Sequence, residues 1–292
     1  MARTKNTPKL TTSGNIAFQG EPGAFSDIAC RQVYKGLKTL PCPTFEDAFL
    51  AVSSGKAALA MIPIENTIAG RVADVHHLMQ GSDLSIIGET FLPIRHCLVG
   101  VKGAKIANLT HVHSHVMALP QCRKNLRALK LKEVVHADTA GAAAEVARKG
   151  DKTQSAIASE LAAKIYGLEI LKHDMQDRDG NVTRFVILSK DKTVAKAGTV
   201  MTSFIFEVKN IPAALYKALG GFATNQVNLT KLESYLEAFN AAEFYCEVEG
   251  HPEERKMQLA FEELRFFTKS VRVLGTYPAH AFRRDGAKAL KK

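Results

Sequence analysis

The order of the predicted strands and helices changes near residue 199, and this change limits the folds that the chain can adopt. Before it, short apolar strands alternate with amphipathic helices, a pattern typical of α/β architectures with largely parallel sheets. Strands are predicted at residues 15–18, 39–42, 57–64, 84–92, 96–101, 111–114, 155–158 and 183–188. Helices are predicted from the turn at 19–23 to about residue 33 and at 45–52, 72–79, 117–129, 139–149 and 160–166. The chain therefore contains a large α/β region.

A different order follows a Lys- and Ala-rich segment at residues 189–198, which is typical of a linker. The segments are a strand at 199–208, a helix at 212–224, strands at 227–236 and 241–250, a helix at 252–268 and a strand at 270–277. This βαββαβ order is the ferredoxin-like arrangement. Because 292 residues exceed the usual size of one hydrophobic core, we expect a domain at 15–190 and a second at 199–280.

The composition is that of folded globular domains, with 46% hydrophobic and 23% charged residues. The formal net charge of +10 suits an anionic ligand, a nucleic acid or a membrane surface, and does not choose among them. Nucleic acid is disfavoured because the aromatic residues lie in apolar strand and helix patterns rather than in a basic stripe. Membrane insertion is disfavoured because no apolar run reaches the roughly 18 residues of a span.

Cysteine usage indicates a reducing compartment. The five cysteines are odd in number and form no C-x-x-C pair, which argues against a disulfide framework and against a zinc cluster of the usual spacing. The first 15 residues lack the apolar stretch of a secretion signal. We therefore expect a cytoplasmic protein.

Polar residues follow the predicted strand at 57–64. Glu65, Asn66 and Thr67 stand at its carboxyl end, where ligands bind in open α/β sheets. The alternative is an ordinary turn in which Asn66 and Thr67 cap backbone amides. The pattern alone leaves both interpretations open.

Three histidines alternate along the predicted strand at 111–114. His111, His113 and His115 would share one face and could bind zinc, with Ser114 on the other face. However, successive residues on one face lie about 6 to 7 Å apart, which hinders convergence on one ion. An alternative uses the Ser114 hydroxyl together with Gln121, about two turns along the following helix.

A third segment, D-G-N-V-T-R-F at residues 179–185, enters an apolar strand. Thr183 and Phe185 would share one face, with Arg184 opposite. A hydroxyl beside an aromatic ring suits a small anionic ring compound, although Thr and Phe are common on any strand. Other schemes lack their motifs: there is no complete dinucleotide fingerprint, no phosphate-binding G-x-x-x-x-G-K-[ST] loop and no G-x-S-x-G elbow.

Taken together and in order, these segments resemble the prephenate dehydratase family. Residues 16–26 match its N-terminal loop, 62–67 its I-P-I-E-N-[ST] segment and 181–185 its N-x-T-R-F signature. Residues 138–143 and 162–168 also fit, so the resemblance covers about 15–188. At 114–122, the family commonly has S-H-P-Q-A-L-x-Q-C, and here Val116 and Met117 replace the P-Q pair.

The resemblance implies a two-lobed catalytic region like the type II periplasmic binding proteins, with the active site between the lobes. The implied reaction converts prephenate to phenylpyruvate, water and carbon dioxide with no metal or organic cofactor, and Thr183 is the implied proton donor. The implied catalytic residues are Thr183, Asn66, Ser114, Gln121 and Glu65, and the implied substrate-binding residues are Thr67, Phe185 and Arg184.

The C-terminal region resembles an ACT domain, which in this family binds phenylalanine at a subunit interface and restrains the enzyme. Residues 210–216 correspond to the loop carrying G-A-L-V, with Ala213 in place of Gly, and Tyr235 replaces the Arg of an E-S-R-P motif. The implied effector-binding residues are Asn210, Ala213, Ala214, Leu215, Glu233 and Ser234. A homo-oligomer, dimer or tetramer, is implied as well.

Two alternatives remain open. One is an arogenate dehydratase, because arogenate carries an amino group where prephenate has its side-chain keto group and the motifs do not separate the two. The other is a non-catalytic amino-acid sensor, because the two-lobed body resembles solute-binding proteins.

Overall fold

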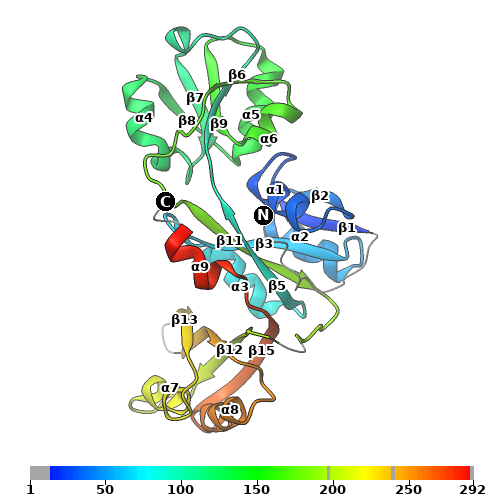
Figure 1. Ribbon diagram of the computed structural model, residues 1–292, viewed down its shortest axis with the longest axis vertical. Helices are drawn as coiled ribbons and strands as arrows, with labels where there is room; N and C mark the ends of the chain where they lie inside the picture. Colours follow the sequence, from blue (N-terminus) through cyan, green and yellow to red (C-terminus); the bar gives the residue numbers. More distant parts are fainter. Residues whose placement is uncertain (1–13, 196–197, 238–240, 290–292) are drawn as a thin grey trace. The chain divides into compact units, whose positions relative to one another are not determined.

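The structure is a computed structural model that describes residues 14–195, 198–237 and 241–289 (Figure 1). Its strands are β1 (Asn15–Gln19), β2 (Lys38–Cys42), β3 (Leu59–Asn66), β4 (Gly70–Arg71), β5 (Ser85–Pro93), β6 (Cys97–Gly100), β7 (His111–His115), β8 (Lys132–His136), β9 (Gln154–Ala158), β10 (Glu169–Lys172), β11 (Val182–Ser189), β12 (Val200–Val208), β13 (Leu229–Glu237), β14 (Ala241–Glu249) and β15 (Thr268–Pro278). Its helices are α1 (Phe25–Val33), α2 (Phe45–Ser53), α3 (Ala73–Gly81), α4 (Arg123–Ala128), α5 (Thr139–Lys149), α6 (Glu160–Ile165), α7 (Ala214–Thr224), α8 (Arg255–Phe267) and α9 (Phe282–Ala289), with 3-10 turns η1 (Ile106–Asn108) and η2 (Leu119–Cys122).

The chain divides into two compact units. As far as it is described, the larger unit comprises residues 14–78, 90–186 and 284–289, and the smaller unit comprises residues 79–89 and 187–283. Residues 79–89 thus join the smaller unit although they lie within the catalytic region expected from the sequence. Part of the expected polar leader (1–13) and of the linker (196–197) lies outside the described residues.

The sheet of the first lobe has the order β2-β1-β3-β11-β5, and β4 pairs with β3. Residues 85–89 of β5 and 187–189 of β11 are counted with the smaller unit. Strand β1 is parallel to both β2 and β3. Its residues Ile16, Ala17 and Phe18 are completely buried, because helices α1 and α2 pack on this sheet. The uninterrupted apolar run of β1 is what a strand covered on both faces requires.

The second lobe is built on a sheet with the order β10-β6-β9-β7-β8. Strands β6, β7, β8 and β9 are labelled in Figure 1. Strand β7 is parallel to β8 and β9, whereas β6 is antiparallel to β9 and to β10. Val112 and Ile157 lie in its apolar core together with Leu126 of α4. The chain passes between the lobes twice, at residues 94–96 and 173–181, and the Ile94 amide donates to the Asn181 carbonyl across these segments (2.8 Å).

The smaller unit has the order β12-α7-β13-β14-α8-β15, and its antiparallel sheet runs β13-β14-β12-β15. This confirms the predicted βαββαβ ferredoxin-like fold. Its core is aromatic: Phe204 stacks on Phe222 at 5.7 Å between ring centroids, and Phe261 meets Phe204 edge-on at 4.9 Å.

One predicted helix was wrong in form. Residues 117–129 were expected to make a single helix, but the structure has the 3-10 turn η2 followed by the short helix α4. Pro120 lies in η2, and a proline has no N–H for the hydrogen bonds of a helix interior. Strands β4, β8 and β10 and helix α9 were not predicted. Among the described residues, no helix is both long and apolar enough to span a membrane.

Candidate active site

An amide network joins the end of β3 to the start of β11. The Asn66 side-chain nitrogen donates to Asn181 Oδ1 at 2.8 Å and to Thr183 Oγ1 at 3.0 Å. Asn66 Oδ1 in turn accepts from the backbone amides of Ile68 and Ala69, both at 2.8 Å, so the turn after β3 fixes its orientation. Because Thr183 Oγ1 accepts from Asn66, its own proton is the one it can donate to a bound molecule.

The network continues through Asn181 to the second lobe. Asn181 donates through Nδ2 to Gln121 Oε1 at 2.7 Å, and Gln121 donates through Nε2 to the Met117 carbonyl at 2.8 Å. The same Gln121 oxygen lies 3.1 Å from Nε2 of His96. Since an amide oxygen only accepts, His96 carries its proton on Nε2. The network therefore connects residues from both lobes through neutral groups.

His96 is held in its neutral form by its surroundings. Its burial lowers its pKa below the ordinary value, and the hydrogen bond to Gln121 opposes that shift only in part. The Phe25 ring meets its imidazole edge-on, with 5.3 Å between ring centroids. A neutral imidazole keeps this wall of the site without charge.

A cavity of about 710 Å³ lies beside the network. Its walls include Thr183, Asn66 and Gln121, the ring of Phe185, and the cationic side chain of Arg71. This volume is in the range of small-molecule sites, which combine apolar walls with a few directed polar groups. The cavity can hold a small ring compound with its polar atoms toward Thr183 and the amides.

Four of the eight predicted catalytic and substrate-binding residues do not line this cavity. Ser114 is fully buried and donates to the Ile157 carbonyl at 2.7 Å, so it ties β7 to β9. Thr67 donates to the Gly180 carbonyl at 2.7 Å and accepts from the Val182 amide at 2.9 Å. Both hydroxyls therefore hold backbone segments near the cavity in place and do not face its interior.

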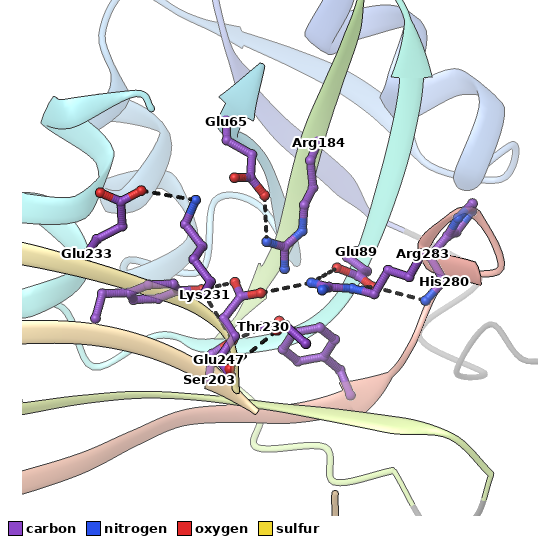
Figure 2. A network of polar contacts seen from close by, with 12 residues as sticks. Glu65, Glu89, Arg184, Ser203, Thr230, Lys231, Glu233, Glu247, His280 and Arg283 are labelled. Carbon is purple, nitrogen blue, oxygen red and sulfur yellow. Dashed lines mark hydrogen bonds and ion pairs between the residues drawn. The ribbon is translucent and has the colours of Figure 1, made fainter. Parts of the chain in front are cut away.

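Glu65 and Arg184 form an ion pair on the other face of these strands. Arg184 Nη1 lies 2.9 Å from Glu65 Oε1, and the Arg184 side chain is 3% exposed (Figure 2). The guanidinium also lies 6.0 Å from the centre of the Phe91 ring. Strand alternation places Arg184 away from Thr183 and Phe185, as the sequence predicted.

The three histidines of β7 have separate surroundings. His113 Nε2 bonds to Gln154 Oε1 at 2.7 Å, and His111 Nδ1 bonds to Thr110 at 2.8 Å. His115 lines the cavity, and burial lowers its pKa. In the part of the chain that the structure describes, they are not among the residues grouped closely enough to hold one metal ion.

The predicted effector residues lie in the smaller unit. Asn210 and Ala213 are exposed in the loop before α7, whereas Ala214 is buried at the start of this helix and Leu215 packs against the core. Ala213 has φ 58° and ψ 30°, the left-handed conformation that Gly adopts most readily. In β13, Glu233 lies 3.3 Å from Lys231 and Ser234 is exposed.

Three residues of the site were not selected from the sequence. Asn181 joins Asn66 to Gln121, His96 fixes Gln121, and Arg71 supplies a cation to the cavity. Asn181 could have been selected from the sequence, because it is the first residue of the N-x-T-R-F segment. His96 and Arg71 carry no local pattern, since only the folded chain brings them to the cavity.

The chain is similar to known proteins in sequence and in fold. The sequence model of the family described as prephenate dehydratase matches residues 16–193. A bifunctional N-acyl-homoserine lactone acylase/prephenate dehydratase of Komagataeibacter europaeus is 48% identical over 92% of this chain and 97% of its own length. An arogenate dehydratase/prephenate dehydratase of Arabidopsis thaliana is 38% identical over 90% and 72%, respectively.

A solved structure shares the fold over almost the whole chain. It is a prephenate dehydratase from Arthrobacter aurescens in complex with L-Phe, with a TM-score of 0.84 and 27% identity over 94% of this chain and 96% of that one. The likeness includes the two periplasmic-binding-protein-like lobes, which the resemblance had implied.

Proposed function

Because the chain belongs to the prephenate dehydratase family, we propose that it converts prephenate to phenylpyruvate, water and carbon dioxide in phenylalanine biosynthesis. The observation that carries this proposal is the position of the Thr183 hydroxyl, which accepts from Asn66 and faces a cavity of about 710 Å³. We propose residues 15–190 as the catalytic domain of this cytoplasmic carbon–oxygen lyase (EC 4.2.1.51).

In the proposed reaction the ring stays intact, and two bonds that join it to its substituents break. The bond between the ring and its carboxylate carbon breaks and releases carbon dioxide, and its electron pair enters the ring. The ring carbon–oxygen bond breaks as the hydroxyl leaves, takes up a proton and becomes water. Thr183 is the proposed donor to this oxygen, and it acts as a directed hydrogen bond because an unperturbed hydroxyl is a poor acid.

The remaining residues have proposed binding and positioning roles. Arg71 suits a carboxylate of the substrate, and Phe185 suits the face of its ring. Gln121 is proposed to orient substrate oxygens. Ser114 and Thr67 act as positioning residues through their backbone partners.

The ion pair between the partly exposed Glu65 and the buried Arg184 gives those two residues different roles from the ones the resemblance implied. Glu65 is proposed to stabilise the strand end that carries Asn66, and Arg184 to stabilise β11 beneath Thr183, because both lie behind the cavity wall. No metal or organic cofactor is required by the proposed reaction, since aromatisation supplies its driving force.

Turnover by the purified protein on prephenate and on arogenate tests this proposal. We expect higher kcat/KM on prephenate, with formation of phenylpyruvate measured by its absorbance. A strong preference for arogenate would make the chain an arogenate dehydratase, an activity that the Arabidopsis relative also has in its name. Absence of turnover on both would favour the non-catalytic sensor.

Hydrolysis of N-acyl-homoserine lactones is a second candidate activity. It is favoured by the 48% identity with the bifunctional relative from Komagataeibacter europaeus, which extends over 97% of that protein. The same preparation, incubated with a long-chain acyl-homoserine lactone and analysed for released homoserine lactone, tests this activity. No release at enzyme concentrations that turn over prephenate would reject it.

We also propose that the smaller unit, residues 199–280, is an ACT-type regulatory domain that binds L-phenylalanine in a homo-oligomer, a dimer or a tetramer. The L-Phe present in the structure of the Arthrobacter aurescens relative supports this proposal. Calorimetry with L-phenylalanine is expected to show binding, and activity is expected to fall in parallel. The absence of heat at millimolar phenylalanine would reject the regulatory role and leave the catalytic proposal intact.

A further inference from the structure

Three side chains meet where strands of the second lobe's sheet begin or end, and the proposed reaction does not use them. Cys97 begins β6, His173 directly follows β10, and Glu160 lies two residues after the end of β9. Because β6 is antiparallel to both neighbours, the first residue of β6 lies beside the last residues of β9 and β10. The fold of the lobe itself thus brings the three residues together.

Two of the separations between the ligand atoms match those of a tetrahedral metal site. Cys97 Sγ lies 3.7 Å from His173 Nδ1, and His173 Nδ1 lies 3.2 Å from Glu160 Oε1. All three ligand atoms lie within 4.8 Å of one another. Zinc bound tetrahedrally with its ordinary bond lengths would separate sulfur from nitrogen by about 3.5 Å and nitrogen from oxygen by about 3.3 Å.

We propose that Cys97, Glu160 and His173 bind one zinc ion through Sγ, a carboxylate oxygen and Nδ1, with water as the fourth ligand. The combination of a thiolate, an imidazole and a carboxylate suits zinc better than magnesium or calcium, which prefer oxygen ligands alone. The side chains of Glu160 and His173 are 64% and 59% exposed, so an ion and its water can reach the site from solvent.

A catalytic triad is the competing interpretation of a Cys, a His and an acidic residue. In such a triad the thiol and the carboxylate bond to different ring nitrogens, because the imidazole passes a proton between them. Here both partners face the same nitrogen, Nδ1 of His173.

The proposed ion would join the two segments by which the chain passes between the lobes. Cys97 follows the first passage at residues 94–96, and His173 begins the second passage at residues 173–181. Glu160, the first residue of α6, adds a third element. A bound ion would therefore stabilise the edge of the second lobe next to His96 and the cavity.

Cobalt(II) is the spectroscopic probe for this site, since it replaces zinc and absorbs in the near ultraviolet when a thiolate is bound. After treatment of the full-length protein with a chelator, we expect one cobalt ion per chain with such a band, and loss of the band when zinc is added. Zinc should raise the melting temperature of the chelator-treated protein, because it binds the folded state.

The substitutions Cys97→Ser and His173→Gln are expected to remove the band and to weaken zinc binding about tenfold or more. Matched controls are Cys42→Ser, which replaces another buried cysteine, and His136→Gln, which breaks a His–Glu pair of the same 3.2 Å separation. Both controls should keep the band. His173 is exposed, so His173→Gln keeps the test valid even where Cys97→Ser perturbs folding. A wild-type protein without the band, or a band that persists in His173→Gln, would overturn the proposal.

Discussion

The larger unit and the smaller unit each contain a network of polar side chains, and the two networks differ in charge. Beside the cavity, Asn66, Asn181, Gln121 and Thr183 bond to one another as neutral groups. In the smaller unit, Arg283 lies between two carboxylates, at 2.7 and 2.9 Å from Glu89 and at 2.8 Å from Glu247 (Figure 2). The Tyr245 hydroxyl also donates to Glu247 at 2.5 Å.

The difference follows from what each network must tolerate. The side chains of Glu89 and Glu247 are completely buried, and removing a carboxylate from water is costly unless a cation and hydrogen bonds replace the lost hydration. Such a network has one stable arrangement. Neutral amides are less costly to bury or to expose, so they can face a cavity that alternates between water and a ligand. The charged network suits a fixed core, and the neutral one suits a binding wall.

The comparison predicts its largest effect for Arg283→Met. This substitution removes the guanidinium and leaves two buried carboxylates, which is expected to lower the free energy of unfolding by about 3–5 kcal/mol. Urea unfolding followed by circular dichroism measures this loss, since the chain has no tryptophan for fluorescence.

Lys269→Met is the matched control for Arg283→Met. Lys269 lies 2.6 Å from Glu207 in the same unit, but its side chain is 50% exposed. An exposed pair of this kind contributes at most about 1 kcal/mol. Equal losses in the two variants would show that the charged network is no more important than a surface pair.

The second prediction concerns the neutral network, where the effect should be on rate rather than on stability. Thr183→Ala is expected to lower kcat by about 10² or more, because it removes the proposed donor to the leaving oxygen. That factor corresponds to about 2.7 kcal/mol of activation free energy. Steady-state kinetics on prephenate measures it.

Thr183→Ser keeps the hydroxyl and is expected to retain most of the turnover. Both variants should unfold at nearly the wild-type urea concentration, since Thr183 is only half-buried. Near-normal turnover by Thr183→Ala would remove this hydroxyl from the mechanism. A large loss of stability in Thr183→Ala would show that the neutral network stabilises the fold as the charged network does.

The fold of both units was accessible from the sequence because its signals are local. Strand alternation, apolar runs and the βαββαβ order do not depend on distant residues. Alternation also separated Thr183 from Arg184 correctly. Where a local rule failed, another local rule explains the failure, as Pro120 does for the interrupted helix after β7.

The bridging residues were not accessible in this way. Asn181 owes its position to Asn66 and Gln121, which are more than 50 residues away along the chain. The same holds for Cys97, Glu160 and His173, whose spacing matches no metal motif and which meet only through the register of three strands. The roles proposed for Ser114, Glu65 and Arg184 remain predictions, and positioning roles are favoured because none of the three lines the cavity.

The third prediction tests the neutrality of the cavity network through pH. Burial lowers the pKa of His96, so below about pH 6.5 the unfolded chain binds a proton that the folded chain does not. The free energy of unfolding should therefore fall as the pH decreases from about 6.5 toward the lowered pKa. Urea midpoints measured across this window in wild type and in His96→Leu isolate the contribution.

The His96→Leu variant is expected to lose less stability on acidification than wild type, with the remainder due to other groups such as His115 and His280, whose pKa values burial also lowers. An unchanged slope in His96→Leu would mean that this imidazole is not kept neutral by the fold.

The smallest predicted effect is at Ala213, on the surface of the smaller unit and away from its charged network. Holding a non-glycine residue in the left-handed conformation lowers the free energy of unfolding by about 1–2 kcal/mol. A glycine removes this strain, but it lowers the free energy of unfolding by about 0.4–1 kcal/mol because it increases the entropy of the unfolded chain. The difference between these two terms means that Ala213→Gly should raise the free energy of unfolding by roughly 1 kcal/mol. Ala223→Gly, within α7, should lower it by about 0.5–1 kcal/mol because that backbone is helical. Urea unfolding of the two variants should give opposite signs, and a loss of stability in both would show that the loop before α7 does not hold Ala213 in a strained conformation.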